Sequence, residues 1–216
     1  MAAKTYIIAF LLIVFSCNLV AQTDEQQLKE WTLKNETNLL EKYTTVQSEW
    51  FVQECLNLAN SMQLDAINTC QLFQSEHINA YVFDNGHVYI STAMLKLIKN
   101  KHQLASILAH EYAHIELQHY LKTIKKMKNP GVFFPKKRVN KLLKKHEQEA
   151  DDWSRNQLKI FGLDYQQINY FLRRVQNIKG NHKNNQHLKL SKRIKTTDDF
   201  EIIDQALIEN FNSLKK

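Results

Sequence analysis

The sequence contains few residues that interrupt regular structure, with only two prolines and four glycines among 216 residues. Both prolines lie in NPGVFFP (129–135), where we expect the main break between helices. There is no internal repeat and no stretch typical of an interdomain linker. The hydrophobic content of 44% is enough for one core, and no linker divides the chain. We therefore predict a single domain over 23–216, with its core in 70–195.

Long apolar runs are also scarce, because residues 6–15, YIIAFLLIVF, form the one run of note. It follows Lys4 and is short for a bilayer span, so residues 1–22 are interpreted as a secretory signal peptide. An uncleaved anchor and a lipoprotein signal with lipidation at Cys17 are the alternatives. The protein is therefore expected to be exported, periplasmic or secreted, and membrane-attached under either alternative.

Cysteine is rare, with three in the chain, and Cys17 would leave with a cleaved signal. The two that remain, Cys55 and Cys70, have no metal-ligand spacing. In an oxidising compartment they can form a disulfide, and two buried thiols are the alternative.

Acidic residues are absent from 122–145, which holds ten lysines and arginines. The net charge of +7 is therefore a local patch. A solvated loop is one interpretation, and a lid over a neighbouring site is another. A third is contact with a membrane surface, with Val132, Phe133 and Phe134 against lipid and lysines on anionic headgroups. No nucleic-acid partner is expected, because the segment lacks interleaved aromatic residues and the chain is predicted to be exported.

The apolar spacing of the rest predicts a mostly helical α+β fold with one small sheet. Two helices are expected in 23–68, and others near 93–115, 139–161, 164–179 and 198–213. Strands near 70–74, 79–83 and 87–91 are expected to form a small antiparallel sheet. Asn85-Gly86 between the last two is a strong hairpin signal.

The motif HEYAH (110–114) suggests a metal site. Residues four apart on a helix share one face, so His110 and His114 can direct their imidazoles to one point. Glu111 is close enough to reach a water on the metal without being a ligand. Two ligands, an adjacent base and an open coordination position are what a zinc hydrolase needs. A surface helix with a solvated histidine pair is the alternative.

A catalytic zinc ion needs a third protein ligand, and His119 is the next histidine in the chain. It lies five residues beyond His114, which is a rotation of about 140° on a continuous helix. The intervening sequence also lacks the glycine turn that brings a third histidine to the metal in metzincins. We therefore do not expect His119 to be a ligand.

The stretch HEQEADD (146–152) offers better candidates. Glu147 is the candidate third ligand, and Asp151, one turn later, can accept the outer N–H of a ligand histidine. His146 is the weaker alternative ligand. Glu149 is about 200° around the helix from Glu147 and is expected to face away. For the whole stretch, a solvated acidic face is the alternative.

Taken together, HEYAH and the later E-x-E-A-D resemble the gluzincin peptidases that include HtpX, the CAAX prenyl endopeptidase, the Oma-type mitochondrial protease and the periplasmic β-barrel-assembly-enhancing protease. INAYVFDNGHVYISTAMLKLI (78–98), FGLDYQQ (161–167) and HLKLSKRI (187–194) are similar to further segments of that family. The resemblance covers roughly 71–194. It implies a zincin-like catalytic domain with two metal-binding helices.

For the metal, the resemblance implies one zinc ion per chain. The implied ligands are His110, His114 and Glu147, with Glu111 as general base and Asp151 behind the ligands.

For the substrate, the resemblance places Asn79 and Ala80 on an edge strand that pairs with the substrate backbone. It places His187 and Arg193 near the substrate carbonyl. Leu188 stands where the family has a proline, which puts the position of His187 in question.

The predicted function is that of a zinc endopeptidase acting on extracytoplasmic polypeptides, either misfolded or membrane-associated. Attack by a zinc-activated water predicts no covalent intermediate. The alternative is a zinc-binding chaperone-like or assembly module with little or no proteolysis. Glu111 favours the enzyme, because a binding module has no need of a general base.

Overall fold

The computed structural model describes residues 24–128, 135–179, 190–195 and 200–214. A helix over 24–42 comes first, followed by the short strand β1 (Thr45–Val46) and helix α2 (Glu49–Ser61). The two helices expected in 23–68 are therefore present, and β1 between them was not predicted. A disulfide joins Cys55 of α2 to Cys70 of the next strand, which decides between the two interpretations of these cysteines.

The sheet contains four strands in the order β1-β2-β4-β3, with β2 (Thr69–Phe73), β3 (Ala80–Val82) and β4 (His87–Ser91) near the predicted positions. Strands β3 and β4 form the expected antiparallel hairpin, and β1 is antiparallel to β2. Strand β2 runs parallel to β4. The expectation of a wholly antiparallel sheet is therefore wrong, and the sheet is mixed.

The hairpin turn depends on Gly86. Its φ of +82° is a conformation that side-chain-bearing residues rarely adopt, and an added Cβ would lie 1.8 Å from the carbonyl oxygen of Ala66. Its N–H donates to the carbonyl of Phe83, and the N–H of Phe83 donates to that of His87. Gly86 thereby fixes the position of the edge strand β3.

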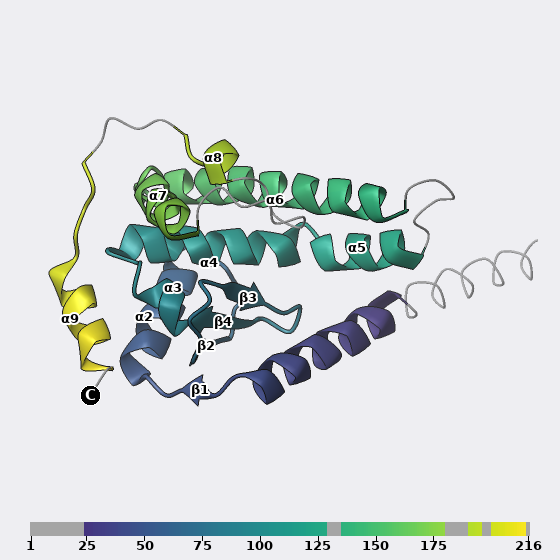
Figure 1. Cartoon of the computed structure of the whole chain (residues 1–216), viewed down its shortest axis with the longest axis horizontal. Helices are drawn as coiled ribbons and strands as arrows, with labels where there is room; N and C mark the ends of the chain where they lie inside the picture. Colours follow the sequence, from purple (N-terminus) through teal and green to yellow (C-terminus); the bar gives the residue numbers. More distant parts are fainter. Residues whose placement is uncertain (1–23, 129–134, 180–189, 196–199, 215–216) are drawn as a thin grey trace, which may run out of the picture.

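Helix α4 (Lys101–Glu116) is the central element of the fold. It lies between the sheet with α2 on one side and the long helix α6 (Pro135–Ile160) on the other (Figure 1). Asn100 caps its start by accepting from the backbone N–H of Gln103. Leu104 and Leu108 are fully buried, and truncating such a side chain typically costs about 2–5 kcal/mol. Because its apolar faces are buried on two sides, α4 is held firmly.

The remaining helices surround this centre. They are α3 (Thr92–Leu95), α5 (His119–Lys128), α7 (Gln167–Lys179), α8 (Leu190–Arg193) and α9 (Gln205–Ser213). Helix α5 follows α4 directly, and α8 lies beside α6 (Figure 1). No helix in the described part of the chain is both long enough and apolar enough to cross a membrane. The prediction of a mostly helical α+β fold is confirmed.

Candidate metal centre

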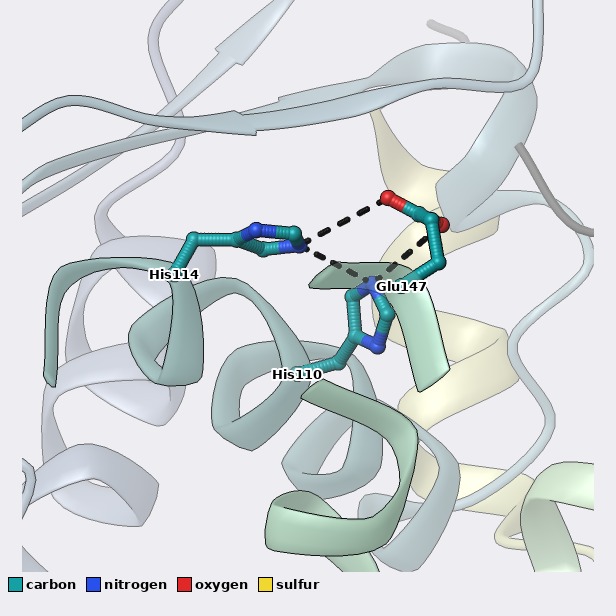
Figure 2. Close-up of side chains that lie close together, drawn as sticks. All are labelled: His110, His114 and Glu147. Atoms are coloured by element: carbon teal, nitrogen blue, oxygen red, sulfur yellow. Dashed lines mark hydrogen bonds and ion pairs between the residues drawn. The ribbon is translucent and has the colours of Figure 1, made fainter. Parts of the chain in front are cut away.

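His110 and His114 lie one turn apart on α4 and direct their imidazoles to the same point. Their Nε2 atoms are 3.4 Å apart, and Figure 2 shows the two rings turned toward each other and toward α6. Both side chains are largely buried, with 12% and 13% of their surface exposed. The helical spacing of the motif therefore produces the arrangement expected from the sequence.

Glu147 reaches the same point from α6. Its carboxylate oxygens lie 3.9 Å from Nε2 of His110 and 3.7 Å from Nε2 of His114 (Figure 2). Two nitrogens bound to a tetrahedral zinc ion lie about 3.3 Å apart, close to the observed separation of the imidazoles. Two nitrogens and one carboxylate that converge in this way fit a divalent ion of the zinc type, with a position left for water.

Asp151 lies one turn after Glu147 and contacts the far side of this group. Its Oδ1 is 3.0 Å from Nδ1 of His110. Arg193, from α8, donates two hydrogen bonds to the same carboxylate, from Nη2 at 2.7 Å and from Nε at 2.9 Å. An imidazole that carries its proton on Nδ1 leaves Nε2 available to a metal, so Asp151 holds His110 in the tautomer that a ligand needs.

The charges around these residues shift their pKa values in opposite directions. Burial would raise the pKa of Asp151, but Arg193 and His110 hold it well below 3.8, so it stays ionised. Burial and Arg193 would lower the pKa of His110, but Asp151 and Glu147 outweigh them and raise it above 6.5. Burial and His110 lower the pKa of His114 well below 6.5. His110 therefore takes up a second proton more readily than His114 does, so a metal that binds here competes with a proton mainly at His110.

Tyr120, on α5, is a residue of this region that the sequence analysis missed. Burial, together with the negative charges of Glu111 and Glu147, raises its pKa well above 10. Its hydroxyl donates to the carbonyl of Val82 in β3 at 2.8 Å. Tyr120 thereby links the edge strand β3 to the helices that carry the candidate metal ligands. No motif in the sequence indicated this role.

The predicted substrate residues lie at the free edge of the sheet. Ala80 begins β3, the outermost strand, and Asn79 directly precedes it. The backbone of Asn79 bonds to Ser91, at the end of β4, through its N–H and its carbonyl. Because backbone groups alternate sides along a strand, those of Ala80 point away from β4. Among the described residues β3 pairs with β4 alone, so the outward backbone groups of Ala80 lie on the side where an added strand would pair, while the outward carbonyl of Val82 accepts from Tyr120.

Two further predictions lie outside the described residues. His187 is one, and the apolar residues Val132, Phe133 and Phe134 of the basic segment 122–145 are the other. Within the described part of that segment, Lys122, Lys125, Lys126 and Leu142 line a surface hollow between α5 and α6. Contact with a membrane there stays a prediction.

A second group of side chains lies behind His114. It contains His119, His146 and Glu149, whose potential ligand atoms all lie within 4.8 Å of one another. Nε2 of His119 is 3.3 Å from Oε2 of Glu149, so Glu149 lies in this second group and not with Glu147. His146 lies in this group and not with Glu147. Burial and the charge of His146 lower the pKa of His119 to about 4.

Comparison with known proteins identifies a family and several similar proteins. Residues 45–180 match the sequence model of Peptidase family M48. The mitochondrial metalloendopeptidase OMA1 of Bos taurus is 44% identical over 45 residues, which are 21% of this chain and 9% of that protein. The beta-barrel assembly-enhancing protease of Escherichia coli (strain K12) is 38% identical over 48 residues, 22% of this chain and 10% of that protein. The matches therefore span about a tenth of the length of these relatives.

Proposed function

This chain belongs to peptidase family M48, and we propose that it is a zinc-dependent endopeptidase whose metal is held by His110, His114 and Glu147. The observation that carries the proposal is the convergence of these three side chains, two from α4 and one from α6, on one point. Two imidazoles and one carboxylate are a ligand set of catalytic zinc sites, which keep a further position for water.

When bound, zinc lowers the pKa of an attached water and polarises the scissile carbonyl. Glu111 follows His110 and lies about 100° around α4 from it, so its carboxylate can reach a water beside the metal position. Glu111 is proposed to act as the general base, which takes a proton from that water and passes it to the leaving amine. Arg193, whose positive charge faces Glu147 at 3.8 Å and Asp151 at 2.7 Å, stabilises negative charge that develops on the carbonyl oxygen. His187 is proposed to assist it.

The substrate is proposed to be a polypeptide that binds in extended form along the free edge of β3, beside Asn79 and Ala80. Backbone pairing of this kind is tolerant of side-chain sequence, as cleavage of unfolded proteins requires. Tyr120 supports the strand from the helical side through its bond to Val82. The bond from Tyr120 thereby holds β3 in place relative to the helices that carry His110, His114 and Glu147.

The compartment is proposed to be extracytoplasmic. Residues 1–22 have the pattern of an export signal, and a disulfide between Cys55 and Cys70 fits an oxidising environment. One relative is named for enhancing β-barrel assembly, which supports substrates among misfolded or membrane-associated proteins of the envelope. The basic segment 122–145 is proposed to contact anionic lipid.

The test pairs cleavage with metal content in purified protein. Glu111→Gln keeps the metal ligands and removes the base, so we expect full zinc content and a loss of casein cleavage of about 100-fold or more. Glu116→Gln, an exposed carboxylate on the same helix, is the matched control and should retain activity. Full zinc in wild-type protein with no cleavage of casein or any unfolded protein would instead support a non-catalytic binding module.

A further inference from the structure

His119 lies beside His114 because the helix does not continue between them. Helix α4 ends at Glu116, Gln118 adopts a φ of +53°, and α5 starts anew at His119. This turn brings Nδ1 of His119 to 3.0 Å from Nδ1 of His114. His119 is 2% exposed, so its ring is held in this position by the surrounding structure.

The contact between the two Nδ1 atoms fixes where the protons lie once a metal binds. A hydrogen bond between two ring nitrogens needs one donor and one acceptor. His114 turns its Nε2 toward the metal point, so its Nδ1 must carry the proton and donate. Nδ1 of His119 then accepts, and the proton of His119 lies on Nε2.

That proton has an acceptor within reach. Oε2 of Glu149 lies 3.3 Å from Nε2 of His119, an ion-pair distance at which the buried nitrogen makes no hydrogen bond among the described residues. Oε1 of the same carboxylate is 3.2 Å from Nζ of Lys145. We propose that His119 and Glu149 are positioning residues for the metal centre, which hold His114 in its ligand tautomer through the His114–His119 hydrogen bond and the negative charge of Glu149 beside Nε2 of His119. This inference rests on the proposed function, because it requires a metal on Nε2 of His114.

This arrangement gives His114 the same kind of support that His110 already has. His110 contacts the carboxylate of Asp151 directly, at 3.0 Å. His114 contacts no carboxylate at its Nδ1 among the described residues, and an intervening imidazole connects it to Glu149. Both candidate ligands thereby have an acidic residue of α6 behind them, Asp151 four residues after Glu147 and Glu149 two residues after it.

A second metal ion bound by His119, His146 and Glu149 is the competing interpretation of this group. The rings of His119 and His146 are stacked, with centroids 4.1 Å apart and planes inclined by 8°. In-plane lone pairs of parallel rings run side by side and do not converge on one ion. A metal on Nε2 of His119 would also remove the proton that the contact with His114 requires. The geometry therefore favours positioning over a second metal.

The experiment measures zinc affinity by competition with a chelator in the full-length protein and two variants of His119. His119→Leu removes the acceptor, and we expect affinity to fall by about 10–100-fold. His119→Gln supplies an amide oxygen that can accept from Nδ1 of His114, so we expect it to recover most of the affinity. His146→Leu, which changes the stacked neighbour, should bind zinc like wild type. Thermal melts of the metal-free proteins verify that each variant folds.

A tautomer measurement gives a readout that a purely structural role would not change. Long-range proton–nitrogen NMR spectra of the zinc-loaded protein should show His119 protonated on Nε2. Protonation on Nδ1, or wild-type zinc affinity in His119→Leu, would overturn the positioning role alone. So would a second zinc equivalent that is lost in His146→Leu. If wild-type protein binds no zinc, the proposed function fails and the positioning role fails with it.

Discussion

At the scale of single residues, Asp151 has two partners that both depend on its charge. It accepts two hydrogen bonds from Arg193 and lies 3.0 Å from Nδ1 of His110. The side chain of Asp151 is 6% exposed and that of Arg193 15%. In such a position, removing one partner leaves the other charge buried and only partly compensated, by Glu147 at 3.8 Å.

We predict that Asp151→Asn weakens both the metal site and the fold. Zinc affinity should fall by about 10–100-fold, because the amide holds the His110 tautomer less firmly. The free energy of unfolding should fall by about 3–5 kcal/mol, because Arg193 loses its main counter-charge. Chelator competition and urea unfolding measure the two effects. Asp152→Asn, at the exposed neighbouring position, is the control, and equal effects in both variants would contradict this role.

Part of the site could be predicted at this scale and part could not. The spacing of His110, Glu111 and His114 is enough to place two imidazoles on one helical face. The position of His119 was derived from a continuous helix, and that assumption failed at Gln118. A positive φ at glutamine has no sequence signal, because glycine and asparagine are the residues that indicate such a turn. The hydrogen bond between His114 and His119 was therefore not predicted.

At the scale of elements, Glu36 connects the helix over 24–42 to the sheet. Its carboxylate accepts from the hydroxyl of Tyr89 at 2.7 Å and from the amide of Asn85 at 2.8 Å. Nδ1 of His87 lies 2.6 Å from the same group. Tyr89 and His87 belong to β4, and Asn85 to the turn before it. One buried carboxylate thus joins the first helix to the hairpin that positions the edge strand.

We predict a pH-dependent loss of stability in Glu36→Gln. Burial would raise the pKa of Glu36, but hydrogen bonds from Tyr89, His87 and Asn85 outweigh it and lower the pKa below 4.5. A lowered folded-state pKa stabilises the fold above the unfolded pKa, and this contribution is lost as the pH falls through the folded one. The variant should lose about 1–3 kcal/mol at neutral pH.

Urea unfolding at a series of pH values measures this difference. It should shrink as the pH falls below the ordinary glutamate pKa of 4.5 and through the lower folded-state pKa of Glu36. Glu41→Gln, which changes an exposed carboxylate on the same helix, should cost little at any pH. A difference between Glu36→Gln and wild type that stays constant down to low pH would contradict the account.

The sheet illustrates what local sequence signals can and cannot predict. Asn85-Gly86 indicated the β3–β4 hairpin, and Gly86 supplies the positive φ that this turn needs. The parallel pairing of β2 with β4 brings together 69–73 and 87–91, and no local signal encodes which edge of the hairpin accepts another strand. Strand β1, with two residues, is too short for an alternating pattern to be seen.

At the scale of the whole molecule, the candidate metal site and the residues behind it connect elements that are distant in sequence. Helix α4 supplies two of its side chains, α6 supplies Glu147 and Asp151, and α8 supplies Arg193. The family resemblance seen in the sequence is confirmed by the match over 45–180. Arg193 lies beyond that match, and its position beside Asp151 comes from the structure. A metal that bridges α4 and α6 should stabilise the fold, by about 2.7 kcal/mol at a hundred times the dissociation constant.

The most direct test of the central claim is the zinc content of the protein after equilibrium dialysis against buffered zinc. We predict one zinc ion per chain in the wild type and in Asp152→Asn, and much less in Glu147→Gln at the same free zinc concentration. Such a result would place the third ligand on α6. Full zinc content in Glu147→Gln, or none in the wild type, would contradict a metal held by His110, His114 and Glu147.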